Sequence, residues 1–371
     1  MISRTTLLAT AAAAALVAFL PAAQAQTSPS PVPATMAAND PTAKADPDMA
    51  KVLAALKALD PKPIETLSPS DARKQPSAAD ATMKVIKDEK IDAKPHAGLD
   101  VSNRRFADMG NLRLRWYVPE KVAKDANLPV IVYFRGGGWV IADLDTYDTS
   151  PAAMARKTGA AVVSVDYPLA PEHKFPAAHE EAIEAYKYVL KNAKGWGYDP
   201  TRVAIVGESA GGNLAINTAI AARDQNLTPP VAIVSVYPVA ATSPDTPSKK
   251  EDANAKPLNT PMLTWFFSHV LNNDGEKGDP RLNLVTANLK GLPPVTVINA
   301  EIDPLRSDGD MLVEKLKAAG VQTEHKLYSG VTHEFFGMDA VVAKAAEAQD
   351  YAAAQLKKGF GGGAMPAPAS K

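Results

Sequence analysis

Beyond Pro119, short apolar stretches alternate along the chain with longer stretches in which apolar residues recur at helical spacing. The short stretches are rich in β-branched residues, as buried parallel strands are. They predict strands at 130–134, 161–165, 202–206, 232–236, 295–298 and 323–328. The longer stretches predict helices at about 149–158, 177–193, 209–223, 306–319 and 339–358. Strands that alternate with helices predict an α/β fold, in which helices cover both faces of a mostly parallel central sheet.

A hairpin precedes this alternating region. Residues 105–106 and 112–117 flank the turn formers Gly110 and Asn111 and have the pattern of two antiparallel strands. The hairpin makes the predicted sheet mixed and raises its size to about eight strands. We therefore predict a core domain over 101–358.

Two further segments do not fit the sheet and predict a helical cap. The first, 46–100, begins with apolar residues at helical spacing from Met49 to Leu59, followed by a possible helix from Ser68 to about Arg73. Its remainder, 74–100, is polar and poorly patterned. The second is an insertion near 245–290 that holds one apolar helix. Long insertions in compact domains are usually functional, although an ordinary peripheral helix with a buried aromatic face fits this pattern too.

The two ends of the chain lack the pattern of a folded core. Residues 1–25 combine Arg4, an uncharged apolar run and the small-residue site Ala23-Gln24-Ala25, which together predict an export signal peptide. An uncleaved N-terminal anchor is the alternative. Residues 26–45 are rich in Pro, Ser, Thr and Ala and predict a flexible leader, and the Gly- and Pro-rich residues 359–371 predict a disordered tail.

The amino-acid composition limits the kinds of partner that the protein is expected to bind. The chain has 371 residues, of which 46% are hydrophobic and 22% charged, with a net charge of −1 and no cysteine. This balance is typical of a globular protein and provides no basic surface for nucleic acid. The lack of cysteine excludes disulfides and a lipid-modified cysteine anchor. We expect no nucleic-acid partner and no stable membrane anchor.

The chain's strongest chemical motif lies at the junction between a predicted strand and a predicted helix. Ser209 stands between Gly207 and Gly211, the Gly-X-Ser-X-Gly pattern of a nucleophile elbow. Glycines let strand and helix approach closely, so that the serine hydroxyl projects at the carboxyl end of the sheet. A tight turn with a structural serine gives the same pattern, so the remaining chain must decide between them.

Two later residues complete a possible catalytic set. Asp303 follows the strand predicted at 295 and His333 follows the strand predicted at 323. Alone, Asp303 fits a helix N-cap and His333 fits a loop histidine. Together they give the order Ser, acid, His that α/β-hydrolases use, with each residue after its own strand. The pattern favours acyl transfer by a serine nucleophile.

A glycine run follows the strand predicted at 130. Gly136, Gly137 and Gly138 can turn backbone N–H groups toward a developing oxyanion. The alternative, a phosphate-binding loop, lacks the Gly-Lys-Ser/Thr ending. No spacing of His, Cys or Glu typical of a zinc site occurs, so we expect no metal and no cofactor.

With these motifs in place, the chain resembles the hormone-sensitive-lipase-like (bacterial family IV) esterases of the α/β-hydrolase fold. The similarity extends from about Met49 to Met338 and rests on the stretches 136–139, 166–178, 207–213, 303–306 and 333–338. The chain departs from the family's usual pattern at Arg135, where the family has His, and at Pro168, where it has Arg.

The resemblance implies roles for several residues. It implies the triad Ser209, Asp303 and His333, oxyanion donors at Gly137, Gly138 and Ala210, and a cap built from the two segments above. Four aromatic residues beside these motifs or in the cap helix are predicted to contact the substrate: Trp139, Tyr167, Trp265 and Phe335.

We therefore expect an exported carboxylic ester hydrolase, found in the periplasm or the medium. Its expected substrates are small esters with short to medium acyl chains, a range that the resemblance implies. Two other functions stay open: an amidase or exopeptidase on the same fold, and a non-catalytic binding protein that retained it. The oligomeric state, monomer or homodimer, is also open.

Overall fold

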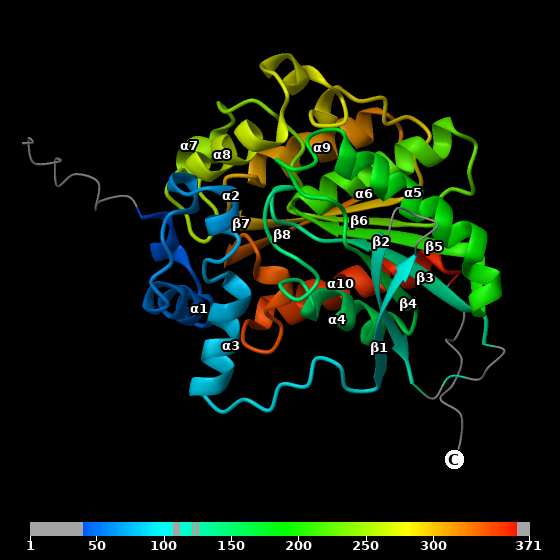
Figure 1. Ribbon diagram of the computed structural model, residues 1–371, viewed down its shortest axis with the longest axis horizontal. Coiled ribbons are helices and arrows are strands. Elements are labelled where there is room, and N and C mark those ends of the chain that lie inside the picture. Colours follow the sequence, from blue (N-terminus) through cyan, green and yellow to red (C-terminus); the bar gives the residue numbers. More distant parts are fainter. Residues whose placement is uncertain (1–39, 107–111, 121, 123–125, 362–371) are drawn as a thin grey trace, which may run out of the picture. The chain divides into compact units, whose positions relative to one another are not determined.

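Eight strands form one mixed sheet in the order β1-β2-β4-β3-β5-β6-β7-β8 (Figure 1). The computed structural model describes residues 40–106, 112–120, 122 and 126–361. β1 and β2 form the antiparallel hairpin, β2 pairs antiparallel with β4, and all other pairs are parallel. The strands are β1 (Leu99–Phe106), β2 (Leu112–Pro119), β3 (Leu128–Phe134), β4 (Ala161–Val165), β5 (Tyr198–Glu208), β6 (Ile233–Val236), β7 (Val295–Ile302) and β8 (Thr323–Thr332). The predicted mixed sheet is confirmed.

Helices cover both faces of the sheet, because alternate residues of the central strands point to opposite sides. Val130, Val132 and Phe134 of β3 belong to one buried cluster, and Ile131 and Tyr133 belong to the other. The first cluster includes residues of α5 (Ala177–Asn192), α6 (Ala210–Asp224) and α9 (Arg306–Ala318). The second includes residues of α4 (Thr149–Thr158) and α10 (Ala343–Gly359), which lie on the opposite side of the sheet in Figure 1. The all-buried pattern of β3 follows from this double cover.

The cap is helical and comes from both predicted segments. The first contributes α1 (Pro47–Ala58), α2 (Pro69–Ala72) and α3 (Ala78–Asp88), and the insertion contributes α7 (Pro247–Glu251) and α8 (Thr260–Val270). The segments meet where the indole N–H of Trp265 donates to the carbonyl of Leu67 at 3.1 Å. Figure 1 shows α2 beside α7 and α8.

Several elements and boundaries differ from the sequence-based expectation. The stretch 74–100 contains the unpredicted helix α3, which begins at a reciprocal capping box between Ser77 and Asp80. Its buried residues Ala78, Ala81, Thr82 and Val85 recur at helical spacing, so the sequence did carry a signal for this helix. Residues Pro41–Lys44 form a 3-10 helix inside the predicted leader, and α10 continues to Gly359, the first residue of the predicted tail.

The N-terminal segment is fastened to the last strand of the sheet. The backbone N–H of Asp46 donates to the carbonyl of Gly330 at 2.8 Å, and Asp48 accepts the N–H of Ala343 at 2.8 Å. Met49 packs beside Thr332, with its sulfur 3.6 Å from the hydroxyl. The first helix of the cap therefore depends on residues almost 300 positions later in the chain.

The predicted signal peptide, the leader up to residue 39 and residues 362–371 lie outside the described residues. Among the helices that the structure does describe, none is both long enough and apolar enough to cross a membrane.

Candidate active site

Ser209 lies at the tight turn between β5 and α6 in a backbone conformation that L-residues rarely adopt, with φ 56° and ψ −118°. Its N–H donates to the carbonyl of Val236 at 2.9 Å, which ties the turn to the neighbouring strand. A Cβ on Gly207 would lie 2.1 Å from the Gly211 carbonyl, and a Cβ on Gly211 would lie 2.0 Å from the carbonyl of Phe134. Only glycine fits these two positions, so the motif's spacing has a steric cause.

The three residues predicted as a triad lie within hydrogen-bond reach of one another. The Nε2 atom of His333 is 3.0 Å from the hydroxyl oxygen of Ser209, and its Nδ1 is 2.7 Å from a carboxylate oxygen of Asp303. The other Asp303 oxygen accepts the N–H of Leu305 at 2.8 Å. The serine, the aspartate and the histidine follow β5, β7 and β8 and are all buried. The carboxyl ends of parallel strands have brought them to one edge of the sheet.

Charge around His333 favours its protonated form. Burial alone lowers the pKa of His333, but the hydrogen-bonded Asp303 carboxylate, with Glu334 and Glu208 behind it, outweighs burial and raises this pKa above its ordinary value. The imidazole is thus suited to accept the serine proton.

A second layer of acids and phenols lies behind the triad. Glu208 is buried beside Ser209 and accepts hydrogen bonds from the hydroxyls of Tyr133 and Tyr237. Burial raises the pKa of Glu208 to about 7, although the tyrosine hydrogen bonds oppose this shift. Glu334 accepts the hydroxyl of Tyr147 at 2.5 Å, and burial raises the pKa of its carboxyl as well. The sequence alone assigned no role to Glu208 or Glu334, which appear there only within the motifs around Ser209 and His333.

The glycine loop after β3 borders the serine. Gly137, Gly138 and Trp139 have φ values of 99°, 58° and 59°, all in the left-handed region. A Cβ on Gly136 would lie 3.1 Å from the Cβ of Ser209, so the loop runs directly beside the nucleophile. The backbone N–H groups of Gly137, Gly138 and Ala210 donate to no acceptor within the described residues. They are the three groups predicted to hold an oxyanion.

Arg135 is buried beneath this loop with no exposed surface. Its guanidinium donates to the carbonyls of Gly136, Ile141 and Tyr167, each at 3.2 Å, and lies 3.6 Å from Asp166. It also stacks 4.2 Å above the ring of Tyr167. The residue that departs from the family pattern therefore acts as a donor to backbone carbonyls.

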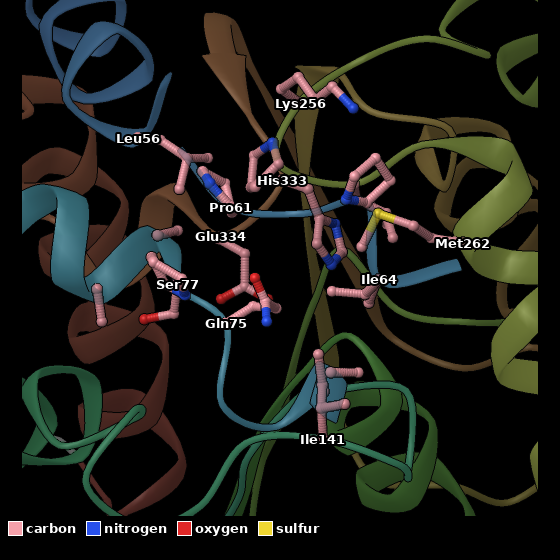
Figure 2. A pocket seen from close by; sticks show the side chains of 18 of the residues that line it. Leu56, Pro61, Ile64, Gln75, Ser77, Ile141, Lys256, Met262, His333 and Glu334 are labelled. Carbon is pink, nitrogen blue, oxygen red and sulfur yellow. The ribbon is translucent and has the colours of Figure 1, made fainter. Parts of the chain in front are cut away.

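A cavity of about 630 Å³ opens above Ser209 and His333. Both halves of the cap line it together with the glycine loop, so the substrate-sized space exists only because the two segments meet. In Figure 2, Glu334 and Gln75 project near the middle of the cavity, between Ser77 on one side and Met262 on the other. Apolar side chains from the cap and the glycine loop form much of the remaining wall: Leu56, Ile64, Leu258, Met262, Phe266 and Ile141.

None of the four aromatic residues predicted to contact substrate lies on the cavity wall, and this part of the prediction is wrong. Trp139 and Phe335 pack away from the cavity, against His179 and Tyr237 respectively. Tyr167 lies under the glycine loop, where its hydroxyl donates to the carbonyls of Arg135 and Gly136. Trp265 joins the two cap segments. The neighbouring Phe266, at the next position of α8, takes the place in the wall that was predicted for Trp265.

Within the described residues, no group of three or more His, Cys, Asp or Glu side chains is arranged to hold a metal ion. His179, which lies on α5, is hydrogen-bonded to Asn213, and burial lowers its pKa to about 4. It has the surroundings of a neutral core histidine.

Residues 131–337, more than half of the chain, match the model of a protein family that is described as the alpha/beta hydrolase fold. The chain belongs to this α/β-hydrolase family. The match includes the glycine loop, the elbow, Asp303 and His333, and it agrees with the strand order described above.

Several relatives of the chain are named as esterases. The chain is 38% identical over 257 residues to "Carboxylesterase NlhH" of Mycobacterium tuberculosis, covering 68% of this chain and 80% of that protein. It is 31% identical to "Ethyl acetate hydrolase" of Pseudomonas putida, covering 77% and 88%. Among solved structures, an esterase from Pyrobaculum calidifontis matches with a TM-score of 0.76 at 32% identity, covering 85% of this chain and 98% of that one. The predicted fold, the family resemblance and the carboxylesterase class of enzyme are confirmed.

Proposed function

We propose that the chain is an exported serine carboxylesterase that uses Ser209, His333 and Asp303 on short- to medium-chain acyl esters. The observation that carries this proposal is the continuous hydrogen-bond chain from the serine hydroxyl through the imidazole to the aspartate, on the floor of a cavity. The esterase relatives support the same reaction class.

Each residue of this hydrogen-bonded triad has a distinct role in the proposed reaction. His333 takes the proton of Ser209 as the hydroxyl attacks the ester carbonyl, and Asp303 fixes the imidazole tautomer and stabilises its charged form. The N–H groups of Gly137, Gly138 and Ala210 receive the oxyanion. His333 then returns the proton to the leaving alcohol, and water attacks the acyl-enzyme by the same route.

The cavity supports the proposed range of acyl chains. Its volume suits a small ligand, and its cap wall is apolar where Leu258, Met262 and Phe266 face the glycine loop. An acyl chain of a few carbons can bury its surface there. Because the wall includes the cap, a long chain would need the cap to move.

A paired assay tests the mechanism and the chain-length range. Ser209→Ala and His333→Ala should each lower kcat by roughly 10⁴-fold or more, with little further loss in the double variant. Asp303→Asn should also be severe, because it permits the wrong tautomer. We expect p-nitrophenyl acetate to be hydrolysed with a higher kcat/KM than p-nitrophenyl dodecanoate. Retention of more than about a tenth of the activity in Ser209→Ala would identify another nucleophile.

Export is the second part of the proposal and rests on residues 1–25 alone. The protein expressed with its natural N-terminus should be released into the periplasm or medium as a chain that begins at Gln26. N-terminal sequencing of the purified protein measures this directly. A membrane-bound product that begins at Met1 or Ile2 would exclude it.

A further inference from the structure

The carbonyl groups of the glycine loop are held from two sides. From below, Arg135 and Tyr167 hold the Gly136 carbonyl, and Arg135 holds that of Ile141. The Gly137 carbonyl accepts the N–H groups of Val140 and Ile141 at 3.0 and 2.9 Å, which closes the turn. The carbonyl of Val140 is held from the cap, because it accepts the Nε–H of Arg73 at 2.8 Å.

Arg73 makes a second bond to the same region. Its NH2 group donates to the carbonyl of Ala170 at 2.8 Å, and the N–H of Ala170 donates to the carbonyl of Trp139 at 2.8 Å. One guanidinium thus reaches the loop directly through Val140 and indirectly through Ala170. The same group forms a bidentate ion pair with Glu172, at 2.8 and 2.6 Å.

The loop needs such support because its backbone is strained. Trp139 and Ala142 are non-glycine residues with φ of 59° and 68°, and such conformations persist only where surrounding contacts hold them. The other half of the cap also touches the loop, since a Cβ on Gly138 would lie 2.4 Å from the ring of Phe266. Both cap segments therefore contact the residues that aim the predicted oxyanion donors.

We propose that Arg73 is a positioning residue through which the docked cap sets the geometry of the oxyanion loop, so that the site becomes fully competent only with the cap in place. This inference rests on the proposed function for its catalytic consequence. Arg73 follows the last residue of α2, and Leu67, just before the start of α2, is bonded in turn to Trp265 of α8. Movement of either cap segment would withdraw the donor from Val140 and Ala170.

The ion pair with Glu172 is the lesser part of this arrangement. The Glu172 side chain is 55% exposed, and exposed ion pairs contribute little because water screens them. The carbonyls of Val140 and Ala170, by contrast, belong to buried residues, so water does not replace the Arg73 donor once it is lost. Glu172→Gln should therefore have a much smaller effect than Arg73→Ala. Lysine at position 73 cannot reproduce the planar fork that reaches three acceptors at once.

Three variants and three measurements test the proposal in the full-length protein. Arg73→Ala should lower kcat on p-nitrophenyl acetate by about tenfold to 10²-fold while KM changes less than about threefold, since misaimed donors weaken the transition state more than the substrate complex. A trifluoromethyl ketone reacts with a catalytic serine to give a tetrahedral hemiketal, whose oxyanion takes the place of the one in the transition state; affinity for it should fall in parallel with kcat/KM, whereas affinity for the matching methyl ketone should not. Lys74→Ala is the matched control, because Lys74 is the next residue and, among the residues that the structure describes, its ammonium forms an ion pair only with exposed Asp71.

Hydrogen exchange supplies a readout that does not depend on turnover. Peptides covering 136–142 should exchange faster in Arg73→Ala than in the parent, in Glu172→Gln or in Lys74→Ala, while peptides covering 205–213 should not change. An inert parent enzyme would refute the proposed esterase function and leave this exchange test intact. The proposal is overturned if exchange at 136–142 is unchanged, or if the activity loss appears in KM alone.

Discussion

A single methyl group at Gly211 offers a sharp test of how the elbow works. In Gly211→Ala, the new Cβ would lie 2.0 Å from the carbonyl oxygen of Phe134 and 2.4 Å from that of Arg135. Contacts of this kind are essentially never below 3.0 Å, so the start of α6 and the end of β3 must separate by about 1 Å. Both neighbours are backbone atoms and cannot rotate away.

That separation has a catalytic consequence because the two elements carry the two halves of the site. Ser209 moves with α6, and the oxyanion loop continues from β3. A displacement of about 1 Å at a reacting centre costs on the order of 10²-fold in rate. We therefore expect Gly211→Ala to lower kcat by about 10²-fold and to destabilise the fold by about 1–3 kcal/mol through overpacking.

Gly212→Ala is the matched control. Both positions lie in the first turn of α6, so the gain in helix propensity is the same for both. The added Cβ at Gly212 would lie 3.0 Å from the Ser235 hydroxyl and 3.1 and 3.2 Å from the Cβ and Cα of Pro238, so these neighbours need to move by only a few tenths of an ångström. We expect kcat within a fewfold of the parent. Steady-state assays on p-nitrophenyl acetate with thermal unfolding of each variant give the comparison. A folded Gly211→Ala enzyme whose kcat matches that of Gly212→Ala would refute the steric reasoning.

Two further predictions concern charge. Because Asp303, Glu334 and Glu208 raise the pKa of His333, activity should rise as pH increases through this raised pKa. Glu334→Gln removes one of these negative charges and should lower the pKa of His333. The acidic limb of kcat/KM, measured from about pH 4 to 9, should therefore move to lower pH. A limb that moves to higher pH would contradict this assignment. Arg135→His should change kcat/KM by less than about tenfold, since the position acts by donating to carbonyls and histidine retains one donor; an inert parent rescued by this substitution would show that the arginine distorts the loop.

The sequence predicted those features of the site that short sequence patterns determine. Ser209 and its flanking glycines, and Asp303 and His333 after their strands, follow from turn sterics and strand order, which a linear pattern records. Arg135 was recognised as a departure from the family pattern, but the sequence did not predict its surroundings. It reaches Asp166 and has no exposed surface.

The cavity could not be predicted because hydrophobic character alone does not say which way each aromatic side chain points. Trp265 and Phe266 are adjacent aromatic residues of α8, yet Trp265 joins the cap segments and Phe266 lines the cavity. The helix α3 was missed although its buried residues recur at helical spacing. The capping residues Ser77 and Asp80 were the available signal for its start.

Because the first cap helix is attached to the last strand, it can dock only after that strand has been made. Met49 is made 283 residues before its partner Thr332, and Asp46 is likewise made long before its partner Gly330. Contacts so distant in sequence form late, because a long loop must close before they form. A growing chain can build much of its sheet before its first cap helix has a partner to pack against. The cavity above Ser209 is therefore complete only after the residues around Gly330 and Thr332 have been made.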